Sequence, residues 1–438
     1  MKTQPAPQST PLVSPPTGRP EELSTPVAAK SEGPRPSFLG RMVLTRMESI
    51  ESGKLSLFEG GRSHTFGQAQ QGLPDATIEV CDPRFWAAIA LRGSVGAGES
   101  YSEGWWRSED PVAVIRTFVR NQDALDGIES GAARISKPLL AGYHALRRNS
   151  EKGSAANIRA HYDVSNEFFG LFLDPTMTYS CGVFETEDAT LEQASIAKID
   201  RLCRKLELAP DDHLLEIGTG WGAFALHAAR EYGCRVTTTT ISKEQHALAK
   251  ERIHAAGLED RITLLFEDYR RLEGQFDKLV SVEMIEAVGA QYYPEFFERC
   301  AKLLKPEGKL ALQAITIADQ HFERARRSVD FIQRHVFPGS CIPSVTALCT
   351  AATKASDLRI TGLDDIGPHY VRTLALWREA LLERWDDARA MGYSNAFLRQ
   401  WEFYFAYCEG GFAERHISDV HMVFEKPGTR PALNPPPA

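Results

Sequence analysis

The feature that most constrains the fold is an apolar strand pattern that runs directly into alternating glycines. The segment 214–217 is apolar apart from Glu216, and Gly218, Gly220 and Gly222 follow it, before a helix-forming stretch (AFALHAAR). Glycine adopts positive φ and carries no Cβ, so such a turn lets a ligand approach the backbone. The order strand, turn, helix predicts one unit of a parallel α/β sheet, with a ligand at its carboxyl edge.

The glycine spacing distinguishes between two kinds of ligand. Dinucleotide-binding turns read GxGxxG, and their third glycine packs a helix whose N-terminus receives a pyrophosphate. This turn reads GxGxG, and the next predicted strand ends in Thr239 and Thr240, without the carboxylate that holds the ribose of a nicotinamide cofactor. S-Adenosylmethionine has no phosphate. The turn therefore favours S-adenosylmethionine, and its alternative is a tight turn that binds nothing.

Composition argues against several other classes of protein. With 438 residues, of which 43% are hydrophobic, the chain can bury the cores of two or three domains. Its net charge of -8 argues against a general nucleic-acid binder. The eight cysteines form no CxxC pair, so no metal site or redox motif is expected, and reduced thiols fit the cytoplasm. No apolar run approaches the roughly 18 residues of a membrane span, so membrane contact is expected to be peripheral.

The two ends of the chain and one internal segment are expected to lie outside the packed domains. Residues 1–36 are rich in Pro, Ser, Thr and Gly, which cannot offset their ordering entropy by burial, so we expect a disordered leader. Residues 428–438 are expected to form a flexible tail. The segment 134–148 (RISKPLLAGYHALRR) places apolar residues at helical spacing beside cations. It is interpreted either as a helix on an anionic membrane surface or as an interdomain helix with solvated charges.

Two domains are expected between these ends. Residues 37–150 predict a small α+β domain with a linker, and residues 151–427 alternate between strands and helices as in a parallel α/β sheet. The predicted fold class is α/β, with the Rossmann-like, mostly parallel sheet of a class I methyltransferase. The first domain is expected to hold strands at 54–58 and 76–80 and helices at 84–91 and 111–120. In the second domain a helix with Ile196, Ile199, Leu202 and Leu206 precedes strands at 213–217, 234–240, 262–266, 277–282 and 309–317, with an edge hairpin from 359–363 and 419–425.

Polar side chains follow several predicted strands at their carboxyl ends, where open parallel sheets bind ligands. Gln245 lies one helical turn beyond Thr240, and both can hydrogen-bond to ribose or methionine atoms. Asp268 and Tyr269 follow the third strand and are candidates for the adenine amino group and ring face. Each of these residues can equally be a helix cap or a turn former.

Two carboxylates stand directly behind the apolar fourth strand, in SVEMIEAVG. Glu283 is interpreted either as a helix cap or as a functional carboxylate. Glu286 is the stronger functional candidate because it belongs to a wider pattern of motifs.

Nine motifs recur in this order in one protein family, and through them the chain resembles the cyclopropane-fatty-acyl-phospholipid synthases. The resemblance covers about residues 158–427 and, more weakly, the preceding domain through GSVGAGESYSEGWW (93–106). The motifs are HYDVSNEFF, TMTYSCGVF, LLEIGTGWG, TTISKEQ, EDYRRL, SVEMIEAVG, VFPGSCIPS, HYVRTLALW and WEFYFAYCEGGF.

The resemblance implies methyl transfer from S-adenosylmethionine to the cis double bond of an unsaturated phospholipid acyl chain. The attack of an alkene on the methyl group leaves a carbocation, which must be kept from water until a proton leaves. In this family bicarbonate is the base and a cyclopropane ring forms. Alternatives are a methyl or methylene branch on the same alkene, methylation of a soluble amine or hydroxyl, and a non-catalytic protein that binds cofactor or lipid. The resemblance further implies an N-terminal lipid-recognition domain in a cytoplasmic, peripherally membrane-associated enzyme, and it allows a homodimer.

The resemblance also assigns site residues by their positions in the motifs. Glu286 is expected to order Tyr370 and the bound anion. The implied catalytic residues are Cys181, Glu286, Gln313, Ile315 through its backbone, and Tyr370. The implied cofactor-binding residues are Tyr179, Ser180, Glu216, Gly218, Gly220, Thr239, Thr240, Gln245, Asp268 and Tyr269.

Two positions depart from the pattern of many family members. Gln313 and Ala287 stand where those members carry His. Glutamine can donate hydrogen bonds to an anion, but it cannot become a cation or pass a proton as histidine does. Plant-type members of the family also carry Gln at the position of Gln313, so ring formation remains the expected outcome.

Overall fold

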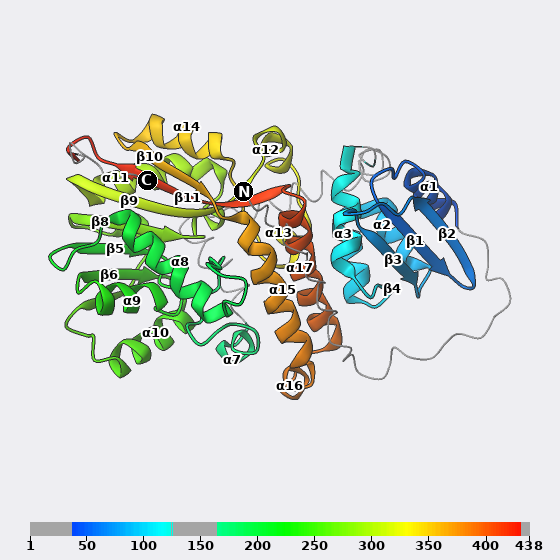
Figure 1. Cartoon of the computed structure of the whole chain (residues 1–438), viewed down its shortest axis with the longest axis horizontal. Coiled ribbons are helices and arrows are strands. Elements are labelled where there is room, and N and C mark those ends of the chain that lie inside the picture. The colour runs from blue at the N-terminus through cyan, green and yellow to red at the C-terminus, as the bar shows by residue number, and fades with distance from the viewer. Residues whose placement is uncertain (1–36, 124, 126–163, 431–438) are drawn as a thin grey trace, which may run out of the picture.

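The computed structural model describes residues 37–123, 125 and 164–430 (Figure 1). The expected leader, the basic segment 134–148 and residues 431–438 of the expected tail lie outside the described residues. The described residues form two sheets, one near each end of the long axis in Figure 1. Within the described ranges, no helix has the length and apolar character needed to cross a bilayer.

The N-terminal unit, residues 37–123, is a four-stranded sheet with helices packed against it. Its strand order is β2-β1-β3-β4, and β1 pairs antiparallel with β2 but parallel with β3. Alternation along β1 buries Leu55 and Leu57 and turns Lys54 and Phe58 to the other face. The elements are α1 (Phe38–Met47), β1 (Lys54–Glu59), β2 (Arg62–Gly67), β3 (Asp75–Val80), α2 (Arg84–Ser102), β4 (Trp106–Arg107) and α3 (Pro111–Arg120).

The second sheet has seven strands in the order β10-β11-β9-β8-β5-β6-β7. The five strands from β9 to β7 run parallel, whereas β11 and β10 add an antiparallel edge. Strand β5 lies between β8 and β6, so the chain changes direction across the sheet beside β5, where open sheets of this kind bind ligands. The strands are β5 (His213–Ile217), β6 (Arg235–Thr240), β7 (Ile262–Phe266), β8 (Phe276–Val282), β9 (Leu304–Ile317), β10 (Arg359–Asp365) and β11 (Ile417–Glu425).

Two separate cores hold helices on the two faces of this sheet. One core joins α8, α9 and α10 to the sheet through residues such as Leu202, Phe224 and Ile253. The other joins α11 and α14 to the opposite face through residues such as Phe297 and Leu348. The helices are α8 (Leu191–Leu206), α9 (Ala223–Glu231), α10 (Lys243–Ala255), α11 (Tyr293–Leu303) and α14 (Val345–Ala355).

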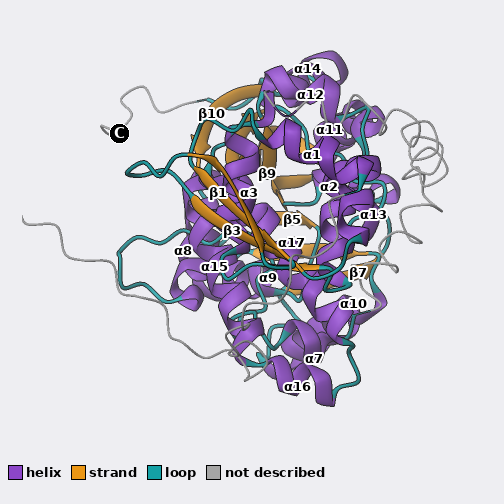
Figure 2. Cartoon of the chain, turned by 90° about the vertical axis from the view of Figure 1, so that its right-hand side faces the viewer, coloured by secondary structure: helices purple, strands orange, loops and turns teal. Residues whose placement is uncertain are grey.

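A layer of helices stands between the two sheets (Figure 1), and α17 is its central member. Figure 2 shows β1 and β3 in front of α17, which packs against both α2 and α3. A Cβ on Gly410 of α17 would lie 2.7 Å from the Ile115 side chain, so only glycine permits this close approach. Glu414 then bonds to both Arg116 and Arg120. This layer contains α7 (Asn166–Phe169), α12 (Asp319–Ala325), α13 (Phe331–His335), α15 (Gly367–Glu383), α16 (Trp385–Ala390) and α17 (Asn395–Ala413).

The expected elements are present, with three differences. Helix α2 continues beyond residue 91 to Ser102, through a kink at Gly93 with φ 54°. Strand β9 starts at Leu304 instead of residue 309, because its first residues pair with β8 across a register shift. Ile196 is 40% exposed, since the buried stripe of α8 runs through Lys198, Ile199 and Leu202.

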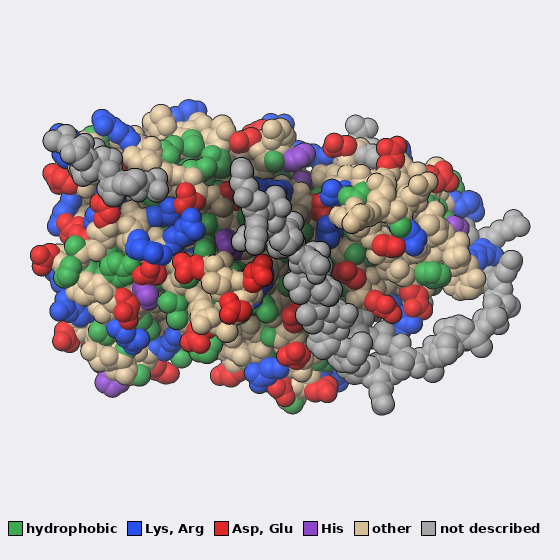
Figure 3. Space-filling view, in the orientation of Figure 1, with side chains coloured by type: hydrophobic (Ala, Val, Ile, Leu, Met, Phe, Trp, Pro, Cys, Tyr) green, Lys and Arg blue, Asp and Glu red, His purple; other side chains and the backbone are tan. Residues whose placement is uncertain are grey.

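The surface carries charges of both signs. Figure 3 shows Lys and Arg side chains interspersed with Asp and Glu side chains over the visible face. This agrees with the modest net charge of the chain and differs from the strongly basic surface that is typical of nucleic-acid binders.

Candidate active site

One pocket opens at the carboxyl ends of the parallel strands, and the glycine turn forms part of its wall. Gly218 and Gly220 have φ of 103° and 52°. The backbone amides of Gly218 and Thr219 donate to the Thr239 carbonyl at 3.1 and 3.0 Å, which ties the turn to β6. All the residues assigned to the cofactor line this single pocket: Tyr179, Ser180, Glu216, Gly218, Gly220, Thr239, Thr240, Gln245, Asp268 and Tyr269.

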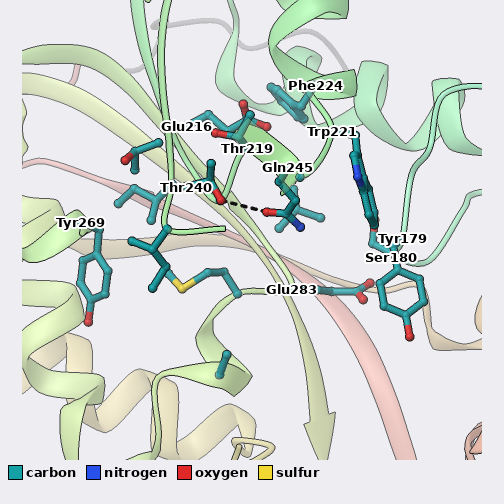
Figure 4. A pocket seen from close by; sticks show the side chains of 18 of the residues that line it. Tyr179, Ser180, Glu216, Thr219, Trp221, Phe224, Thr240, Gln245, Tyr269 and Glu283 are labelled. Carbon is teal, nitrogen blue, oxygen red and sulfur yellow. Dashed lines mark hydrogen bonds between the residues drawn. The ribbon is translucent and has the colours of Figure 1, made fainter. Parts of the chain in front are cut away.

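Hydrogen bonds fix the polar side chains on the β6 side of the pocket. The Thr240 hydroxyl donates to Gln245 Oε1 at 2.9 Å (Figure 4). Ser242 caps α10 by accepting from the Gln245 amide, so the first turn of the helix carries Gln245 to the pocket. Ser242, and not Gln245, is therefore the cap of this helix, and the amide nitrogen of the Gln245 side chain can bind a ligand.

Glu216 is a buried carboxyl at the end of β5. Its Oε2 accepts from the Thr238 hydroxyl at 2.6 Å, and Thr238 also contacts the Thr219 hydroxyl at 2.7 Å. Burial raises the pKa of Glu216 to about 8. Below that pH Glu216 is a neutral hydrogen-bonding group in the pocket wall.

Asp268 and Tyr269 line the far side of the pocket, but each also has a partner in the protein. Asp268 accepts two side-chain hydrogen bonds from Arg270, at 2.8 and 2.7 Å. Tyr269 is buried, and its ring packs edge-on against Phe296. Their assignment to adenine remains a prediction, in which Asp268 would hold Arg270 and the ligand together.

Three of the residues assigned to catalysis meet at one side chain, Glu283. The backbone amide of Cys181 donates to Glu283 Oε1 at 2.8 Å, and Gln313 Nε2 donates to the same oxygen at 2.8 Å. The Tyr370 hydroxyl donates to Glu283 Oε2 at 2.7 Å. Glu283 lines the pocket and lies beside Tyr179 and Ser180 in Figure 4, whereas its three donors are not among the residues that line the pocket.

The cap interpretation of Glu283 is wrong. The short helix that follows, residues 285–287, has Met284 at its N-cap position and no side-chain cap. Glu283 itself has φ 45°, a conformation that L-residues rarely adopt. Its carboxylate reaches partners on three distant segments, which the sequence alone could not bring together.

Glu286 has a different environment from the one expected. Its Oε1 accepts from the Ile315 backbone amide at 2.5 Å, while its buried Oε2 has no partner among the described residues. Burial and the nearby Glu283 charge raise the pKa of Glu286 to about 8. The expectation that Glu286 orders Tyr370 is wrong, because the Tyr370 hydroxyl is bound to Glu283.

Gln313 connects Glu283 to a buried carboxyl. Its amide nitrogen also donates to Asp419 Oδ2 at 2.7 Å, and its amide oxygen contacts His421 Nε2 at 3.2 Å. His421 lies opposite Gln313 in the β9–β11 register. An amide can serve both carboxyls at once, which one imidazole N–H cannot do.

Lys198 supplies a buried cation to this cluster, and sequence reasoning missed it. Its ammonium donates to Ser180 Oγ at 2.8 Å, and the residue lines the pocket. Burial lowers the pKa of Lys198, while Glu283 and Asp419 oppose that change. The sequence did contain an indication of this role, because Lys198 lies one helical turn before Leu202 on the apolar stripe of a predicted helix. A lysine that is buried there needs an anionic partner.

Comparisons with known proteins agree with this geometry. Residues 149–422 match the family model described as mycolic acid cyclopropane synthetase. The chain is 36% identical over 342 residues to the tuberculostearic acid methyltransferase UfaA1 of Mycobacterium tuberculosis, covering 76% of the chain and 79% of that relative. It is 35% identical over 363 residues to the cyclopropane-fatty-acyl-phospholipid synthase of Escherichia coli K12, covering 82% and 90%.

Solved structures give the same relationship. The cyclopropane synthase MmaA2 from Mycobacterium tuberculosis is 34% identical, with a TM-score of 0.58 over 62% of this chain and 98% of that one. The mycolic acid cyclopropane synthase CmaA1, complexed with SAH and CTAB, is 32% identical with the same TM-score and coverage. The chain therefore belongs to the mycolic acid cyclopropane synthetase family and is an S-adenosylmethionine-dependent methyltransferase.

Proposed function

We propose that this enzyme methylates the cis double bond of an unsaturated acyl chain in a phospholipid. The observation that carries the proposal is the hydrogen-bonded carboxylate of Glu283, which lines the glycine-turn pocket. Methylation of an amine or hydroxyl loses a proton from nitrogen or oxygen, which water can accept, whereas ring formation from an alkene needs a positioned acceptor for a proton from carbon.

The residues of the pocket divide into a cofactor side and a reaction side. S-Adenosylmethionine supplies an electrophilic methyl group when it is bound. The Gly218–Gly220 turn, Thr240 and Gln245 would hold its methionine and ribose parts, because together they offer open backbone and fixed polar groups.

Aromatic side chains close the reaction side. The pocket is lined by Tyr179, Trp221 and Phe337, and the Tyr179 hydroxyl bonds to that of Tyr404 at 3.0 Å. An apolar and aromatic wall excludes water from a carbocation, which otherwise would be captured as an alcohol. It also fits the hydrocarbon chain of a lipid.

Bicarbonate was expected as the base, but the protein groups do not fit it. Donors assigned to that anion already bind protein carboxyls: Cys181 and Tyr370 donate to Glu283, and the Ile315 amide donates to Glu286. A free anion would have to displace these bonds and lie beside the carboxyls of Glu283 and Glu286. In this proposal the proton acceptor is therefore a group other than bicarbonate.

The finer points of the proposal concern the product and the place of action. A cyclopropane ring is the favoured product, and a methyl or methylene branch is the alternative. A cyclopropane-fatty-acyl-phospholipid synthase among the relatives supports the ring, and a tuberculostearic acid methyltransferase supports the alternative. The proposal further includes peripheral association with the cytoplasmic membrane surface, lipid recognition by the N-terminal unit, and a homodimer.

Incubation of the purified chain with S-adenosylmethionine and vesicles of an unsaturated phospholipid tests the proposal. The expected result is an acyl chain one carbon heavier and formation of S-adenosylhomocysteine, both measured by mass spectrometry. Vesicles of a saturated phospholipid are the matched control, since they lack the double bond. Equal cofactor turnover with saturated and unsaturated lipid would contradict the proposal.

A further inference from the structure

We infer that Glu283 is the general base of this enzyme and occupies the position that bicarbonate takes in the family. The inference rests on the proposed function, because it assigns the proton acceptor for the same alkene methylation. It makes the base a part of the chain instead of a bound anion.

The first support is the set of donors around Glu283. Both carboxylate oxygens are held: Oε1 by the Cys181 amide and Gln313, and Oε2 by the Tyr370 hydroxyl. Carboxylate and bicarbonate share a planar pair of oxygens that accept such bonds. Three of the groups expected to bind the free anion, Cys181, Gln313 and Tyr370, therefore hold the Glu283 side chain instead.

The second support is the backbone of Glu283. Its φ of 45° is in the left-handed region, and such a conformation costs on the order of 1–3 kcal/mol in a non-glycine residue. Glycine would adopt it without strain. The turn itself would favour glycine here. Because the strained residue is a glutamate whose carboxylate accepts three hydrogen bonds, we infer that glutamate is needed for its side chain.

The third support is the charge of the cluster. Glu286 and Asp419 are buried, Glu283 is half-buried at the pocket wall, and Lys198 is a buried cation near them. Burial and repulsion from Glu283 raise the pKa of Asp419 well above its ordinary value, which disfavours a charge on Asp419. Lys198 then balances one carboxylate. A bicarbonate ion would add a second buried negative charge that no described cation balances.

The position of Glu283 also suits the chemistry. Among the cluster of Cys181, Glu283, Gln313 and Tyr370, Glu283 alone lines the pocket. A carboxylate beside a carbocation can form an ester with it, which would stop the reaction. Hydrogen bonds to both oxygens reduce the nucleophilicity of Glu283 and fix its orientation, while a C–H proton can still reach it.

The step balances without another reactant. After methyl transfer, a C–H bond of the new methyl group breaks and its proton forms an O–H bond with Glu283. The electron pair of that C–H bond closes the ring onto the cationic carbon. If a hydride shift moves the cation to the carbon that bears the new methyl group, the same proton loss gives a methylene branch. Glu283 later releases the proton to solvent.

The test compares Glu283→Gln and Glu283→Gly with wild type and with Glu298→Gln, a matched change at a half-exposed residue of α11. Turnover is measured on unsaturated phospholipid vesicles in argon-purged buffer with and without added bicarbonate. Binding of S-adenosylhomocysteine is measured by calorimetry. The melting temperature is recorded with and without bicarbonate, as a readout that does not depend on turnover.

We expect wild type and Glu298→Gln to turn over equally with and without bicarbonate. Glu283→Gln should bind S-adenosylhomocysteine within about twofold of wild type and lose turnover by about a hundredfold or more, the scale of a removed general base. Glu283→Gly relieves the backbone strain and frees the donors, so bicarbonate should raise both its melting temperature and its turnover, the latter by about tenfold or more.

Three results would overturn the inference: wild-type turnover that depends on bicarbonate, near wild-type turnover of Glu283→Gln, or a Glu283→Gly variant that does not respond to bicarbonate. Failure of the proposed function looks different. In that case wild type binds S-adenosylhomocysteine but forms no methylated lipid under any of these conditions.

Discussion

Replacement of Glu286 by Gln should change how stability depends on pH. The difference in unfolding free energy between the variant and wild type should have opposite signs at low and at high pH. The pKa of Glu286 rises from an ordinary 4.5 to about 8 through burial and the Glu283 charge. The folded state therefore holds a proton between these pH values that the unfolded state releases. The contribution of protonated Glu286 to the free energy of unfolding is fully present below about pH 4.5 and is lost as pH rises toward 8. At about 1.4 kcal/mol per pH unit, the total loss for wild type is at most about 5 kcal/mol.

Glutamine copies the protonated form and removes this dependence. Its amide N–H₂ at the position of Oε2, which has no partner among the described residues, carries one hydrogen more than the O–H of the protonated carboxyl, and this additional unpaired donor costs about 1–3 kcal/mol at every pH. Glu286→Gln should therefore be less stable than wild type below about pH 5 and more stable above about pH 7. Urea denaturation at intervals from pH 4.5 to 9, followed by tryptophan fluorescence, measures the difference. Parallel curves, with a constant offset at all pH values, would refute the reasoning.

Three further predictions address the cofactor, the product and the membrane. Gly218→Val should abolish binding of S-adenosylhomocysteine in calorimetry, because a side chain at φ 103° is strained and fills the pocket wall; Gly257→Val, at φ 64° with no atom near its Cβ and remote from the pocket, is the matched control and should bind normally. If loss of a proton to Glu283 closes the ring, cofactor with a trideuterated methyl group should leave two deuteriums in a product that resists mild hydrogenation. Three deuteriums would indicate a methyl branch formed by reduction of the cation, and a product that takes up hydrogen would indicate a methylene branch. Binding to anionic vesicles should weaken as salt rises, because candidate cations include Lys137 and Arg327; sedimentation that is equal at low and high salt would contradict an electrostatic contribution.

The sequence predicted the elements whose signals are local. The strand at 213–217 and the turn after it follow from apolar residues beside glycines, and the cofactor residues follow because strand ends meet at one edge of a parallel sheet. The Glu283 network could not be predicted in this way. Tyr370 is 87 residues from Glu283, and Gln313 is 30 residues away. Which carboxylate receives their hydrogen bonds depends on side-chain directions that the motif order does not encode.

Register explains the residues that sequence reasoning missed on the last strand. Asp419 and His421 meet Gln313 only because β11 pairs antiparallel with β9 in one particular alignment. A shift of one residue would turn both side chains to the other face of the sheet. The hairpin was expected, but its alignment with β9 was not part of the local pattern, so these two side chains were not expected in the site.

Helix α17 connects the N-terminal unit to the wall of the pocket. Phe403 packs against Tyr101 and Trp106 of the N-terminal unit, and the next residue, Tyr404, holds the hydroxyl of Tyr179 in the pocket wall. Adjacent residues of α17 thus contact the two different units. Removal of the N-terminal unit would expose Phe403 to water on the side where Tyr101 and Trp106 now cover it, one residue before Tyr404. The N-terminal unit therefore supports the helix that carries Tyr404, while the pocket itself is lined by residues of the second unit.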